Sequence, residues 1–290
     1  MTAAVNGPVR LTVDQLRAVA VSARLAALPT VLGLGALYPS TGRHADGVRP
    51  RPQEKLDEAN LTTAGQRYPG IDAAISALGR PERELAMRLV TPDGIGRFSA
   101  VRRENSSLLA GRVGEVITID DIDPHSGLPG VVTELLAVLP SSRPAEVLAV
   151  TAPLDDFTEC LRDSHDSREL ADRIRTLGVE TRTAMALGAA LGSRQAFAEI
   201  VYYTFVPGEG RVSRSSGAVA VFYTKRGRIV SAPSVSPSGE PWITLKAGSD
   251  HVVRQAINQL VSLSDIDWAT PVRHRGARPG RQPRSNEITN

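Results

Sequence analysis

The two halves of this chain contain the same order of expected elements, and this repeat constrains the fold more than any single motif. An expected helix over residues 128–139 carries apolar side chains at Val131, Val132, Leu135, Leu136 and Leu139. Another, over residues 250–263, has the same spacing at Val252, Val253, Ala256, Ile257 and Leu260. Such spacing places the side chains on one helix face. The match predicts two versions of one unit.

Each half is expected to run from a strand through helices to several strands and the closing helix. In the first half we expect a strand at 9–12, a helix capped by Thr12 or Asp14 through residue 27, helices at 53–63 and 69–78, and strands at 84–90, 97–103, 106–113 and 116–119. In the second we expect a strand at 148–152, helices at 154–162, 167–177 and 181–191, and strands at 197–206, 218–224, 229–232 and 242–246.

This order predicts an α+β fold in which two pseudo-symmetric halves join into a central, mainly antiparallel sheet flanked by helical bundles. Residues 1–145 and 146–268 would be the two halves of one domain. The last 22 residues, 269–290, hold five arginines against Glu287 alone, which gives +4, while the whole chain carries +3. Three prolines and this charge predict a disordered basic tail. Residues 1–268 therefore carry −1, which argues against nucleic acid as a partner.

The composition also argues against cofactors and membrane insertion. The one cysteine, Cys160, excludes an internal disulfide and suits a reducing cytoplasm. The five histidines have no metal-ligand spacing, and no dinucleotide or Walker pattern is present, so no cofactor and no metal are expected. No apolar signal segment is visible in residues 1–10. Residues 25–42 are uncharged but interrupted by Pro29 and Pro39, which predicts a buried irregular segment rather than a membrane span.

Two local patterns have structural explanations. The run "DSHDS" at Asp163–Ser167 contains serine, histidine and acid groups, but catalytic triads are not adjacent in sequence. We therefore interpret Asp166 or Ser167 as the N-cap of the next helix. The pair Gly188 and Gly192 predicts close helix packing in a soluble bundle, because the flanking arginines leave too little length for a membrane span.

The stretch "YTKRGRIV" contains Lys225, Arg226 and Arg228 between two β-prone runs. Gly227 can adopt a positive φ, so the pattern predicts a hairpin with these charges at a solvated turn rather than a phosphate site. The preceding run "AVAVFY" is apolar on both faces. It should be a central strand, covered by helices on one face and by helices or a partner on the other.

Four long segments carry a pattern that is familiar as a whole. They are "VRLTVDQLRAVA" at 9–20, "RPERELAMRL" followed by "GRFSAVRRENSSLLAGRVGEVITI" at 80–119, "DSRELADRIRTLGV" at 166–179, and residues 210–261. These segments resemble the EspG family of ESX (type VII) secretion-associated proteins of actinobacteria. The resemblance is one of overall pattern over about residues 9–263, and it is strongest in the C-terminal half. The arginine-rich tail and the loop "RHADGVRPR" at 43–51 do not match that pattern.

The resemblance implies a cytosolic chaperone without enzymatic activity or cofactor. Members bind PE-PPE heterodimers by the apolar helical tip of the PPE subunit, keep it soluble and direct it to a secretion system. Another helical secreted protein is the alternative client. This is recognition of an amphipathic helical tip by an apolar surface. The implied anchors are Tyr203, Phe222 and Trp242, with Lys225, Arg226 and Arg228 at the rim; the three aromatics could equally be core residues.

Two other functions stay open from the sequence. A nucleic-acid-binding transcriptional regulator would use the helices before Arg80 and the arginine tail, although "PGIDAAISAL" has no side chain suited to reading base edges. An enzyme would need a deep pocket lined by converging polar groups.

Overall fold

The computed structural model describes residues 8–38, 62–63, 66–67, 70–206 and 211–270. In the first half, the strands are β1 (Val9–Thr12), β4 (Arg83–Thr91), β5 (Gly94–Arg103), β6 (Ser106–Val113) and β7 (Val116–Ile122). The helices are α1 (Val13–Ser22), α3 (Ile71–Gly79) and α4 (Gly127–Ala137), with short 3-10 turns η1 (Thr30–Leu32) and η2 (Pro124–Ser126). The two-residue strands β2 (Thr62–Thr63) and β3 (Gln66–Arg67) pair with each other.

The second half supplies six strands and four helices within the described ranges. The strands are β8 (Val150–Pro153), β9 (Arg194–Val206), β10 (Arg211–Arg214), β11 (Val219–Thr224), β12 (Gly227–Val235) and β13 (Pro241–Ala247). The helices are α5 (Leu154–Leu161), α6 (Ser167–Arg175), α7 (Thr181–Gly192) and α8 (Asp250–Ser262).

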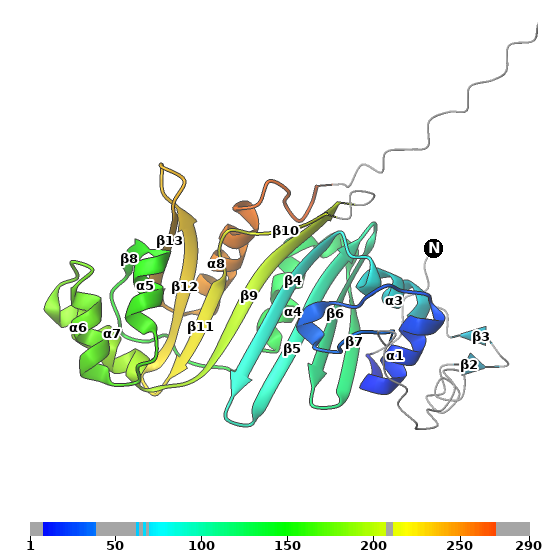
Figure 1. Cartoon of the computed structure of the whole chain (residues 1–290), viewed down its shortest axis with the longest axis horizontal. Helices are drawn as coiled ribbons and strands as arrows, with labels where there is room; N and C mark the ends of the chain where they lie inside the picture. Colours follow the sequence, from blue (N-terminus) through cyan, green and yellow to red (C-terminus); the bar gives the residue numbers. More distant parts are fainter. Residues whose placement is uncertain (1–7, 39–61, 64–65, 68–69, 207–210, 271–290) are drawn as a thin grey trace, which may run out of the picture.

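One antiparallel sheet joins the two halves (Figure 1). Its order is β1-β7-β6-β5-β4-β9-β11-β12-β13-β8, with β10 paired to β9. Outward from the central pair β4 and β9, the strands are β5, β6, β7 and β1 on one side and β11, β12, β13 and β8 on the other. On each side three strands follow in sequence order, and the outermost strand is the first strand of its half. This is the strand order that two joined copies of one unit would produce. The predicted α+β class with a large antiparallel sheet is confirmed.

Helices α4 and α8 cover the middle of one face of the sheet, called here the rear face (Figure 1). Their buried residues, among them Val131, Val132, Val253 and Ile257, share one apolar core with Leu85, Ile200 and Val221 of the sheet. The repeated apolar pattern of the two closing helices therefore marks the side chains that bury against the same face.

The opposite face, called the front face, is covered mainly at its two ends. Helices α1 and α3 with η1 form one apolar core over β5, β6 and β7, where Leu16 and Ile75 meet Leu108. Helices α5, α6 and α7 form another over β8, β12 and β13, where Phe157 and Leu187 meet Leu245. The sheet spans both cores, so the middle of its front face lies between two groups of helices (Figure 1).

Most expected elements are present with shifted ends. Thr12 caps α1 in a capping box with Gln15, but the helix ends at Ser22 rather than residue 27. The expected helix at 53–63 is wrong at its end, since Thr62–Thr63 forms a strand, and its other residues lie outside the described ones. Strand β10 was not predicted, because its "RVSR" lacks a strand-like apolar pattern. Of the tail expected to be disordered, 269–290, residues 271–290 lie outside the described residues, and so does the loop at 43–51.

Candidate partner-binding surface

The middle of the front face presents side chains from four adjacent strands. Strand register places residues that face each other across the ladder on the same side of a sheet. Val90 pairs with both Ile95 and Phe197, Arg88 pairs with Glu199, and Phe197 pairs with Phe222. We call this surface the open face: Arg88, Val90, Ile95, Phe197, Glu199, Ala220 and Phe222. Each of its members is exposed or partly exposed in the described structure.

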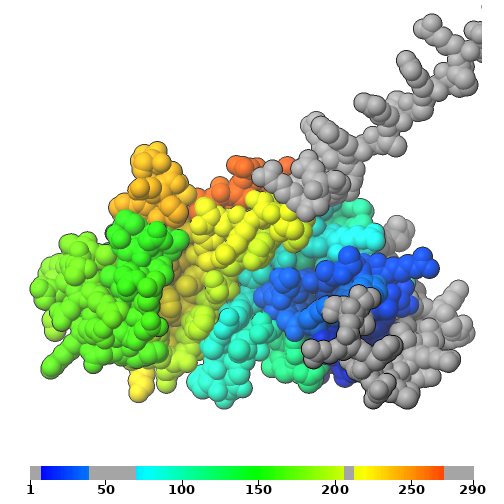
Figure 2. Space-filling view, viewed as in Figure 1, coloured from blue at the N-terminus to red at the C-terminus, as the bar shows by residue number. Residues whose placement is uncertain are grey.

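The open face is apolar in composition and lies at the molecular surface. Figure 2 shows the yellow and cyan atoms of the central strands between the green atoms of α5–α7 and the blue atoms of α1. Ile95 is 41% exposed. Phe222 is partly buried against the core beneath α5–α7, so it stands where the open face meets that group of helices. Partly exposed aromatic and branched side chains grouped in this way are typical of a protein-binding surface.

A hollow of about 260 Å³ continues the front face toward β10. Its lining includes Leu28, Leu78, Glu84, Tyr203, Phe205 and Val212. Val212 is 56% exposed, whereas Glu84 is buried at 4% exposure and accepts a hydrogen bond of 2.7 Å from the Ser99 hydroxyl. Burial raises the pKa of Glu84 to about 7, against the lowering influence of that hydrogen bond. The hollow is therefore apolar with one carboxyl group in its wall.

The structure separates the three aromatic residues expected as anchors. Tyr203 and Phe222 project from the front face, Tyr203 at the hollow and Phe222 in the open face. Trp242 pairs with Ser234, which lies two and four residues from the rear-face core residues Ala232 and Val230 of the same strand. Because alternate residues of a strand share a face, Trp242 belongs to the rear face. Only Tyr203 and Phe222 can therefore serve one front-face surface.

The three basic residues expected at the rim lie in different surroundings. Thr224 pairs with Gly227, so Lys225 and Arg226 form the exposed turn of the β11–β12 hairpin, as the sequence predicted. The expectation that Arg228 is a solvated charge is wrong, because Arg228 is 2% exposed. Its Nε donates to the Gly248 carbonyl at 2.5 Å, and its guanidinium forms an ion pair with Asp250 at the start of α8. Arg228 thus fastens α8 to β12 and is not a rim residue.

Gly227, at the start of β12, lies against the segment that connects the two halves of the chain, and this contact requires glycine. Its φ is +115°, and a Cβ there would lie 2.8 Å from the backbone nitrogen of Ala145. The adjacent Arg228 amide donates to the Arg143 carbonyl at 2.7 Å, and the Ala145 amide donates to the Arg228 carbonyl at 3.0 Å. The connecting segment therefore packs directly on the start of β12, which only glycine permits.

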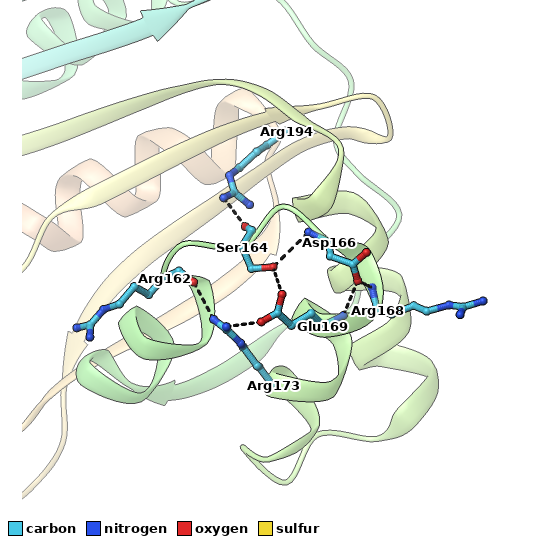
Figure 3. Close-up of polar contacts among 7 residues, drawn as sticks. All are labelled: Arg162, Ser164, Asp166, Arg168, Glu169, Arg173 and Arg194. Carbon is cyan, nitrogen blue, oxygen red and sulfur yellow. Dashed lines mark hydrogen bonds and ion pairs between the residues drawn. The ribbon is translucent and has the colours of Figure 1, made fainter.

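The run "DSHDS" forms a hydrogen-bonded network at the start of helix α6 (Figure 3). Asp166 caps α6 by accepting from the amides of Arg168 and Glu169, which confirms the capping interpretation. The Ser164 hydroxyl donates to Glu169 at 2.7 Å, and this hydrogen bond, with the nearby Arg173, lowers the pKa of Glu169. The serine is thus bound to a carboxylate that also pairs with Arg173. No group of metal-binding side chains occurs among the described residues.

The pair Gly188 and Gly192 lets α7 approach the start of α6. A Cβ on Gly188 would lie 2.6 Å from the Ser167 carbonyl oxygen, and one on Gly192 would lie 2.4 Å from the Ser167 hydroxyl. This confirms close helix packing in a bundle. Among the residues described, no helix has the length and hydropathy needed to cross a bilayer.

The sequence profile of the EspG family matches residues 12–259, which is most of the chain. The chain belongs to the EspG family. The match covers both halves, and so it includes every strand that contributes to the open face.

EspG proteins of different ESX systems are similar to this one at low identity. ESX-1 secretion-associated protein EspG1 of Mycobacterium tuberculosis is 27% identical over 259 residues, covering 88% of this chain and 87% of the relative. ESX-3 secretion-associated protein EspG3 of Mycolicibacterium smegmatis is 25% identical over 266 residues, covering 90% and 88%.

A solved structure shares the fold. It is that of the Mycobacterium tuberculosis type VII secretion system chaperone EspG5 in complex with a PE25-PPE41 dimer. The similarity has a TM-score of 0.76 at 17% identity and covers 91% of this EspG-family chain and 99% of the solved one. The antiparallel sheet with helices on both faces is therefore the fold of a known type VII secretion chaperone.

Proposed function

We propose that this protein is a cytoplasmic chaperone of type VII secretion. Its client would be a PE-PPE heterodimer or a similar helical secreted protein, held by the apolar helical tip of the PPE-type subunit. The chaperone keeps that tip soluble and directs it to the secretion system, without catalysis and without a cofactor. What supports the proposal is family membership together with the fold that the chain shares with EspG5, whose solved complex contains a PE25-PPE41 dimer.

The observation that carries the proposal is the open face. An apolar surface built on a rigid sheet, between two groups of helices, suits an amphipathic helical tip that is desolvated on docking. Phe222 and Phe197 lie opposite each other in the ladder and supply aromatic anchors. Lys225 and Arg226, at the turn of the β11–β12 hairpin that contains Phe222, supply an exposed basic rim. Tyr203 and Phe205 extend the apolar area into the hollow.

A solubility experiment tests this function. A tagged copy is used to capture partners from the cytosol of the native organism, and the captured subunits are then co-expressed with and without the chaperone. We expect a helical secreted-type protein to be captured and to stay in the soluble fraction only when the chaperone is present. Capture of nucleic acid instead, lost on deletion of residues 271–290 and weakened steeply by salt, would contradict the proposal and favour a regulator.

A further inference from the structure

A row of charged residues crosses the front face and reaches the middle of the open face. Arg112 of β6 pairs with Arg97 of β5, Arg97 pairs with Arg88 of β4, and Arg88 pairs with Glu199 of β9. Residues paired in this way share a face and lie within side-chain reach of one another. Three arginines and one glutamate therefore stand side by side on an otherwise apolar surface.

Two of the three arginines hold the η1 segment in place. Arg97 donates from Nη1 to the Val31 carbonyl at 3.2 Å. Arg112 donates from Nη1 to the carbonyls of Leu32 and Gly33 at 3.0 and 2.7 Å. Their guanidinium groups satisfy carbonyls at the end of η1 that lack helical partners. These two charges are accounted for by the fold.

Arg88 differs from its two neighbours. It is exposed, and it makes no hydrogen bond or ion pair with any residue of the described part of the chain. Along its own strand, the nearest positions on this face are apolar: Ala86 precedes Arg88 and is 6% exposed, and Val90 follows it. Its cross-strand neighbours are Arg97 and Glu199. No hydrogen bond or ion pair within the described residues engages this guanidinium at the centre of the sheet.

We propose that Arg88 selects clients, by pairing with a carboxylate carried near the apex of the client's helical tip. This inference rests on the proposed function and adds the chemistry of the contact. Docking of the tip removes water around Arg88, and a guanidinium–carboxylate pair in such surroundings is strong and oriented because it is bidentate. Glu199, one strand away, repels a tip whose carboxylate is displaced toward β9. Together the two charges fix the register of an otherwise apolar contact.

The test compares substitutions at Arg88 with one at Phe222. The probe is the partner complex captured by the tagged wild-type chain, titrated at low and high salt against Arg88→Met, Arg88→Lys, Arg88→Glu and Phe222→Asp. Methionine keeps an unbranched apolar stem and removes the charge, so its variant separates packing from pairing. Because Arg88 is exposed, its substitutions leave folding intact, and circular dichroism checks the folding of all four variants.

We expect Arg88→Met to weaken binding about 10-fold to 100-fold, the range for loss of a charge-assisted hydrogen bond. Arg88→Lys should weaken it less and Arg88→Glu more, and the salt dependence should diminish in Arg88→Met. Reversal of one client acid to arginine should restore binding to Arg88→Glu. Binding of Arg88→Met equal to wild type, while Phe222→Asp fails to bind, would overturn the role of Arg88 and leave the chaperone function standing. Failure of the wild type to capture any helical partner would overturn both.

Discussion

Arg83 donates a hydrogen bond of 3.0 Å from Nε to the carbonyl oxygen of Asp267, 184 residues later in the chain. The same guanidinium donates to the carbonyls of Glu82 and Thr270 at 2.7 and 3.1 Å. Trp268 lies between these contacts at 2% exposure. The segment that follows α8 is thereby tied to the start of β4, so the first half of the chain holds the end of the second.

Replacement of Arg83 by alanine should destabilise the fold by about 3 kcal/mol or more. The carbonyl groups of Glu82, Asp267 and Thr270 would each lose a donor, and the volume of the buried guanidinium would be left empty. Urea unfolding followed by circular dichroism measures the change. Arg80→Ala provides a matched control, because Arg80 is exposed. Equal unfolding midpoints for the two variants would show that the Arg83 contacts do not stabilise the protein.

Glu84 should make the protein less stable as the pH rises. Its pKa is about 7 in the folded state and 4.5 in its ordinary state, so the folded protein binds the proton more tightly than the unfolded chain does. Stability from this group is complete below about pH 4.5 and is lost as the pH rises through 7, by on the order of 3 kcal/mol.

The variant Glu84→Gln tests this dependence of stability on pH. The amide oxygen can still accept the Ser99 hydrogen bond, but it cannot ionise. The variant should unfold like wild type at about pH 4.5 and at a clearly higher urea concentration than wild type at about pH 8. An identical dependence on pH in both proteins would mean that the pKa of Glu84 does not differ between the folded and the unfolded protein.

Gly188→Ala should separate α6 from α7. Alanine raises helix propensity by about 1 kcal/mol, but its methyl group would collide with backbone atoms of Ser167 and Ala171, at 2.6 and 2.7 Å. Overlap with backbone should dominate, with a net loss of about 1–2 kcal/mol in the free energy of unfolding. Met185→Ala on the same helix is the control, since Met185 is 60% exposed. A stabilised Gly188→Ala protein would contradict the close packing.

Much of the fold could be predicted because its signals are local. The repeated apolar spacing of the closing helices identified the residues that α4 and α8 bury, since helix periodicity fixes which side chains share a face. Thr12 with Gln15, and Asp166, marked helix starts through caps that lie within three residues. The element ends differed because packing, rather than propensity, ends most helices and strands.

The site was predicted less well because it depends on non-local pairing. Phe222 and Trp242 look alike as strand aromatics, yet the register through β12 puts them on opposite faces. Arg228 read as a turn charge because its partners, Gly248 and Asp250, lie about 20 residues away. Arg88 was not predicted as a site residue, because its strand, "RELAMRLVT", does not alternate regularly between apolar and polar side chains. Its significance comes from Arg97 and Arg112, whose contacts with η1 are visible only in three dimensions.

Two aromatic residues on opposite faces of one sheet, Phe222 and Trp242, can show which face holds the client. Binding of the captured partner complex is measured by titration calorimetry for Phe222→Asp and Trp242→Asp, each checked for folding by circular dichroism. We expect Phe222→Asp to weaken binding by about 30-fold or more, as loss of an interface anchor does, while Trp242→Asp binds like wild type. Weakened binding by Trp242→Asp, with Phe222→Asp unaffected, would place the client on the rear face and contradict a client site on the open face.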